Sequence, residues 1–106
     1  MPWIMLVIAG LLEVAWACSM KLSAGFTKPA ATAFTLALMA ASFGLLSMSM
    51  RTLPLGTAYT IWTGIGAIGA FVVGIVVFGE QLSAARVAAA VLIVCGVLLM
   101  KLSTPA

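Results

Sequence analysis

Charged residues are scarce in this sequence, and histidine is absent. Only 7% of the 106 residues are charged, whereas a soluble domain has roughly 25%. Without histidine, metal sites and proton relays lose their commonest ligand. The five cations are scattered and form no basic patch, so we expect no nucleic-acid partner. The sequence also offers no nucleophile–base pair and no phosphate-binding loop, so we expect no enzyme, no metal and no cofactor.

Apolar side chains, in contrast, make up 65% of the sequence. A chain of this length cannot hide that much apolar surface in a soluble core of its own. We therefore predict an all-α membrane protein with a single transmembrane domain over residues 1–106 and the lipid bilayer as its surroundings. The two cysteines lie inside apolar runs, and we interpret them as small apolar side chains rather than as a disulfide.

The charges and turn residues divide the chain into four hydrophobic runs. We predict transmembrane helices over about 2–20, 30–50, 56–79 and 84–102. The uncharged stretch 29–50 would reach about 33 Å as a helix, enough to cross the hydrocarbon. Ser83 is placed to cap the last helix. Because the connections are short, neighbouring spans are expected to be antiparallel.

The positive charges barely favour either orientation in the membrane. Arg51 and Lys101 would lie on one side, and Lys21, Lys28 and Arg86 on the other. One possibility is a single orientation set by the one extra charge. The other is insertion both ways up, in which case two opposed copies can pair and supply the inverted symmetry common in transporters.

Glu13 lies inside the first hydrophobic run, in LLEVAW, and is one of only two acidic residues. A charge within a span costs a few kcal/mol, and intramembrane carboxyls are usually functional. Its helical neighbours include Gly10 and Trp16, so a small residue and an aromatic ring share its face. No cation lies on that face, which favours a cationic substrate as the partner. A carboxyl that is merely hydrogen-bonded for packing is the alternative.

The third run, TAYTIWTGIGAIGAF, places Tyr59 and Trp62 on one helical face. Aromatic rings beside a carboxylate suit an organic cation, and both side chains carry a hydrogen-bond donor. Ser42, near the middle of the second run, bonds either to its own helix or to a carboxylate across the bundle. Ala89 and Gly96 make the fourth helix a candidate for packing or dimerisation.

These pieces together resemble the small multidrug resistance family of proton-coupled exporters. The resemblance rests on LLEVAW, KLSAGFTK and LPLGTAYTIWTGIGAIGA, and it covers nearly the whole chain. WTGIGAIGA, Trp16 and Lys101 point to the guanidinium-exporter branch. The resemblance implies an antiparallel, dual-topology homodimer in the bacterial plasma (inner) membrane. It also implies bending at the glycine stretch of the third helix, which contains Gly64, Gly66 and Gly69.

The resemblance further implies that Glu13 binds either a proton or the substrate. Trp16, Ser42, Tyr59 and Trp62 would form the shell around it, with Gly10 beside it. The expected function is proton-coupled export of guanidinium and small guanidinyl cations, because a planar guanidinium matches a carboxylate bidentately.

Two alternatives stay open. One is export of quaternary ammonium or other hydrophobic cations from the same site. The other is a proton-conducting proteolipid or membrane assembly subunit, against which the four spans already count.

Overall fold

The computed structural model describes residues 2–104 and contains four helices in the predicted order. Each helix is long and apolar enough to cross a membrane, which confirms the all-α membrane fold. A helix of this length extends about 30 Å, the thickness of the hydrocarbon core. The helices are α1 (Pro2–Leu22), α2 (Pro29–Ser49), α3 (Leu55–Val76) and α4 (Ala84–Ser103).

The helix ends follow local chemistry. Pro29 begins α2, at a position where its missing N–H is no loss. Ser83 caps α4 by accepting a hydrogen bond from the backbone N–H of Arg86 at 3.2 Å, as predicted. The third helix ends at Val76, three residues before the predicted 79. There the chain turns through Gly79 at φ +66°, and the Glu80 N–H bonds back to the Gly74 carbonyl.

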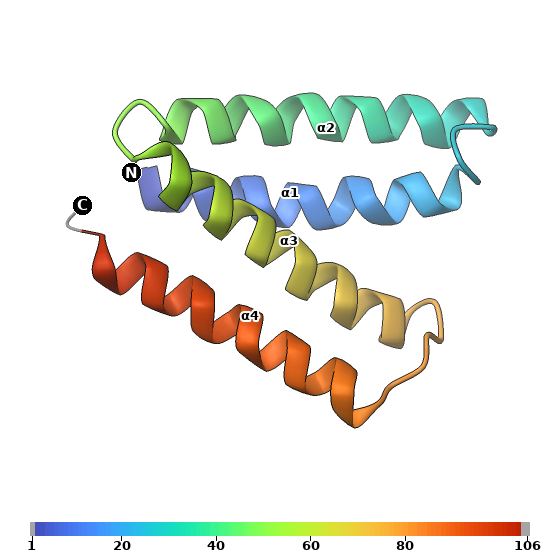
Figure 1. Ribbon diagram of the computed structural model, residues 1–106. Helices are drawn as coiled ribbons and strands as arrows, with labels where there is room; N and C mark the ends of the chain where they lie inside the picture. Colours follow the sequence, from blue (N-terminus) through green and yellow to red (C-terminus); the bar gives the residue numbers. More distant parts are fainter. Residues whose placement is uncertain (1, 105–106) are drawn as a thin grey trace.

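The packing order differs from a closed four-helix bundle. Helix α1 lies against both α2 and α3, whereas α4 lies beside α3 at the edge of the molecule (Figure 1). The last turn of α4 also reaches α1, where Lys101 Nζ lies 4.9 Å from the centre of the Trp3 ring. Within the described residues, α4 has no buried side chain. Apart from side chains such as Val97 and Met100, which pack against the core, most of its apolar surface is left uncovered by the subunit.

The core lies where α1, α2 and α3 meet near one end of the subunit. Its buried apolar residues are Leu6, Ala9, Leu46, Leu53, Ala58, Ile61 and Trp62. Buried hydroxyls join α1 to α2 further along: Thr35 donates a 2.6 Å hydrogen bond to Ser19 Oγ, and Ser19 donates to the Ala31 carbonyl. Such interhelical bonds hold spans together where lipid offers no hydrophobic drive.

The two ends of the subunit carry the charges as the sequence suggested. The α2–α3 connection and both ends of the described chain lie at one end (Figure 1). The α1–α2 and α3–α4 connections lie at the other. Arg51 and Lys101 are thus separated from Lys21, Lys28 and Arg86 by the thickness of the membrane.

Candidate cation site

Glu13 projects from the middle of α1 toward α3 and is partly buried. Its Oε1 atom is buried and has no hydrogen-bond partner among the described residues. It is the one acidic residue inside the four helices, since Glu80 lies in the α3–α4 connection. A buried carboxyl oxygen with no partner is a vacant acceptor. It is therefore available to a proton or to a cationic donor.

Glycines allow α1 and α3 to approach at this level. A Cβ added to Gly10 would lie 2.6 Å from Ile65 Cγ2. One added to Gly66 would overlap the Glu13 side chain, and one added to Gly69 would overlap Val14. The predicted neighbour Gly10 thus acts through helix packing. Gly64 allows α3 and α4 to approach in the same way, because Val97 of α4 occupies the space that a Cβ on Gly64 would fill.

Trp16 lies one turn beyond Glu13 on α1, as its spacing predicted. Its indole Nε1 is buried and, among the described residues, has no acceptor. The ring stands edge-on to Phe43, with the ring centroids 6.1 Å apart. The site region therefore contains an unpaired acceptor on Glu13 and an unpaired donor on Trp16.

Four aromatic rings form a continuous chain from α1 through α2 to α3. After the Trp16–Phe43 pair, Phe43 lies 5.6 Å from Trp62, and Trp62 lies 5.6 Å from Tyr59. These separations are typical of interacting rings. The sequence argument missed Phe43, although a mid-span aromatic next to Ser42 was a usable signal. The structure joins three predicted shell residues, Trp16, Tyr59 and Trp62, through this ring.

Ser42 is fully buried and bridges α1, α2 and α3. Its hydroxyl donates to the Ala9 carbonyl at 2.7 Å and accepts from Trp62 Nε1 at 3.0 Å. It thus bonds across the bundle rather than within its own helix, but to α1 backbone rather than to Glu13. In this subunit Ser42 and Trp62 are therefore hydrogen-bonded to each other. This bond holds in place the four rings of Trp16, Phe43, Trp62 and Tyr59, called the aromatic wall below.

Of the remaining predicted residues, Gly66 contacts the Glu13 side chain, whereas Ala89 and Gly96 lie on α4. Ala89 and Gly96 are exposed on α4, where Gly96 has open space beside its Cα. Gly64, Gly66 and Gly69 lie within an unbroken α3. Glu80 forms an ion pair with Arg86 at 3.5 Å, and both side chains are 41% exposed. Glu80 is thus a solvated residue of the α3–α4 connection.

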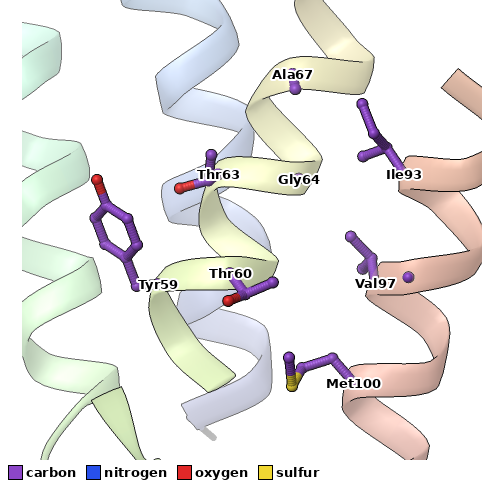
Figure 2. Close-up of a pocket in the computed structure, with 9 residues that line it drawn as sticks. Tyr59, Thr60, Thr63, Gly64, Ala67, Ile93, Val97 and Met100 are labelled. Carbon is purple, nitrogen blue, oxygen red and sulfur yellow. The ribbon is translucent and has the colours of Figure 1, made fainter. Parts of the chain in front are cut away.

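A cavity of about 470 Å³ lies between α3 and α4, away from Glu13. In Figure 2, Ile93, Val97 and Met100 project from α4 toward α3, whereas Tyr59 projects from the opposite side of α3. Because its lining is almost entirely apolar, this cavity does not suit a small cation.

Four membrane spans and a carboxyl inside them, one turn from Trp16, suit a small transporter of cations. The chain belongs to the Small Multidrug Resistance protein family, whose model matches residues 1–94. It exports small cations across the membrane, and it is not an enzyme. Its relatives are bacterial, and its four spans make it a multi-pass protein of the bacterial inner membrane.

Curated relatives match over nearly their full length. Proteins from Citrobacter freundii and Salmonella typhimurium are each 53% identical over 104 residues, covering 98% of this chain and 99% of theirs. A protein from Escherichia coli K12 is 50% identical over the same extent. All three are named guanidinium exporters.

Proposed function

We propose that this protein is a proton-coupled antiporter that exports guanidinium and small guanidinyl cations. The observation that carries the proposal is the Glu13 carboxyl, held inside the membrane with Oε1 buried and unpaired among the described residues. Three relatives that are at least 50% identical to this chain bear the name guanidinium exporter, which supports this choice of substrate.

The chemistry of the site suits a planar cation. A guanidinium presents paired N–H donors that match the two oxygens of a carboxylate. The flat ion can also lie against an aromatic face, and the chain of rings from Trp16 to Tyr59 supplies such faces. Ser42 and Trp62, bonded to each other, hold this wall in place. In the assembled site the shell of Glu13 consists of Trp16, Ser42, Tyr59 and Trp62, with Gly10 behind it.

Proton and substrate compete for Glu13 in this mechanism. The deprotonated carboxylate binds the cation, and protonation removes the counter-charge and releases it. Because one group serves both ligands, an inward proton gradient drives outward movement of the cation. Access alternates between the two membrane faces as the subunits rock, with bending at the glycine stretch Gly64–Gly69 of α3.

The working unit in this proposal is an antiparallel homodimer. Two features of the subunit support it. The first is α4, whose apolar side chains are all at least partly exposed in the single subunit. The second is the near-balanced number of positive charges at the two ends, which permits insertion both ways up. Pairing through α4, with Ala89 and Gly96 in the contact, would cover the exposed face and bring two Glu13 carboxyls to one site.

The test is coupled exchange in sealed liposomes. The purified protein is reconstituted with an internal pH dye, and a guanidinium gradient is imposed. We expect protons to move opposite to guanidinium, and we expect Glu13→Gln to abolish this flux. Glu80→Gln is the matched control, because it neutralises the other acid of the chain in an exposed connection. It should retain exchange.

Two outcomes would redirect the proposal. Flux with tetramethylammonium but none with guanidinium would assign the site to quaternary ammonium ions. Robust guanidinium–proton exchange by Glu13→Gln would remove the carboxyl from the mechanism altogether.

A further inference from the structure

We propose that Gly66 is a positioning residue for Glu13: because Gly66 has no side chain, it leaves the space in which the Glu13 carboxyl lies. This inference deepens the proposed function and rests on it for its effect on transport. It assigns to Gly66 a role distinct from helix bending, namely fixing the location of the proton- and cation-binding group.

The geometry is specific. Gly66 is buried in α3, opposite the middle of α1. An ideal Cβ on it would lie 2.7 Å from Glu13 Cγ and closer still to Cδ and Oε1. All three of its nearest neighbours belong to Glu13. The carboxyl thus occupies the volume that any other residue at position 66 would fill.

Other glycines provide the comparison. A Cβ on Gly69 would overlap Val14, whose branched side chain has little freedom to move away. A Cβ on Gly44 would meet nothing within 4 Å. Alanine at position 69 therefore forces α1 and α3 apart, whereas alanine at position 44 disturbs nothing. Alanine at position 66 meets the flexible end of a glutamate, which can swing aside.

The expected consequence is a displaced carboxyl in a folded protein. Gly66→Ala gains helix propensity, and the long Glu13 side chain absorbs the overlap by changing rotamer. The carboxyl then leaves its place beside the α3 backbone. Misplacement of a binding group by about 1 Å can reduce activity by two orders of magnitude.

The first test reads the carboxyl directly and needs no substrate. The chain contains two glutamates and no aspartate, so protein labelled with ¹³C at the glutamate carboxyl carbon gives signals from Glu13 and Glu80 alone. We expect Gly66→Ala to shift the Glu13 resonance and to change its titration midpoint by about one pH unit or more. Glu80 serves as the internal reference and should not change. Gly44→Ala, whose added Cβ meets nothing within 4 Å, should leave the Glu13 midpoint unchanged.

The second test measures guanidinium affinity through tryptophan fluorescence. Gly66→Ala should bind about tenfold or more weakly, and Gly44→Ala should bind like the wild type. If the wild type binds no guanidinium, the proposed function fails while the carboxyl measurement still decides the role of Gly66.

A Glu13 resonance and midpoint unchanged in Gly66→Ala would overturn the proposal, as would an equal change in Gly44→Ala. If Gly66→Ala does not fold, the double variant Glu13→Ala/Gly66→Ala decides the matter. Folding of the double variant would support the proposal, because the overlap is then with Glu13. Failure of both variants to fold would overturn it.

Discussion

At the scale of single residues, the two acids of the chain show how surroundings decide a role. Glu80 is exposed and pairs with Arg86, an arrangement that contributes little to stability. Glu13 has a buried Oε1 that, among the described residues, lacks a partner. The same side chain is thus a surface charge in one place and, in the proposed function, the binding group in the other.

Acidification should weaken guanidinium binding, because a proton on Glu13 removes the charge that holds the cation. Where the protonated form dominates, one competing proton per site predicts about a tenfold loss of affinity per pH unit. At higher pH the affinity should become constant. Equilibrium binding measured across a pH series checks this, with Glu80→Gln expected to follow the same curve. A guanidinium affinity that does not change with pH would contradict competition between guanidinium and a proton for the Glu13 carboxyl.

Phe43 should matter for substrate binding although the sequence argument passed over it. Phe43→Ala removes the ring that joins Trp16 to Trp62. Each lost ring pair is worth about 0.5–1.5 kcal/mol, so guanidinium affinity should fall several-fold. Phe34→Ala is the control, since Phe34 is a 63% exposed ring on the same helix. Equal effects of the two substitutions would show that the aromatic chain has no special role.

Ser42→Ala should destabilise the subunit by leaving the buried Trp62 N–H unpaired and by removing the interhelical hydrogen bond to the Ala9 carbonyl. Interhelical hydrogen bonds in membranes are worth about 0.6 kcal/mol on average and up to about 1.7, and this one serves three helices. Thermal unfolding in detergent would report the loss. Ser47→Ala changes an exposed serine of α2 and should have no such effect. A Ser42→Ala variant as stable as Ser47→Ala would count against the bridge.

At the scale of helices, the sequence was sufficient for the number and order of the spans. Every charged residue except Glu13 lies near a helix end, and so do Pro29 and Pro54, so each boundary except the end of α3 falls within two residues of its prediction. The end of α3 was predicted too late. The prediction places it at Gly79, whereas the helix already ends at Val76 and the turn begins at Val77.

Contacts between helices were harder to predict. Periodicity placed Trp16 near Glu13 and Tyr59 near Trp62, since both pairs lie on single helices. It could not show that Ser42 would bond to Ala9, or that Glu13 would rest on Gly66. These contacts depend on the relative depth and rotation of two helices, which one-dimensional spacing does not contain.

Helix α4 should be the element that pairs subunits. Gly96→Leu adds bulk to an exposed position with open space in the subunit, so the subunit itself should fold. If the Ala89–Gly96 face packs against a partner, the added side chain should reduce the dimer fraction about tenfold or more, the effect of about 1.4 kcal/mol of overpacking. Sizing or cross-linking in lipid would measure it. Ala88→Leu, about 80° away around the helix, is the control, and equal effects would exclude this face.

At the scale of the whole molecule, the near-symmetry of charge permits insertion of the subunit both ways up. A single extra cation at one end leaves the insertion machinery with almost no preference. In the proposed antiparallel dimer, each subunit, with α4 largely uncovered and one Glu13, contributes half of a symmetric site. Opposed copies would complete it with faces equivalent from either side of the membrane, which is what an exchanger between two compartments requires.

Orientation should therefore be controllable by a few surface charges, with activity following orientation. Lys21→Gln and Lys28→Gln with Thr52→Lys places three cations at the α2–α3 end against one at the other, and Arg51→Gln with Gln81→Lys enlarges the excess at the opposite end to four against one. Reporter enzymes fused to the C-terminus, each active on one side of the membrane only, should both respond for the wild type and singly for each variant. Neither variant alone should exchange guanidinium for protons, and co-expression of the two should restore exchange. Full activity of either variant alone would show instead that parallel subunits suffice and that the balanced charges serve no assembly.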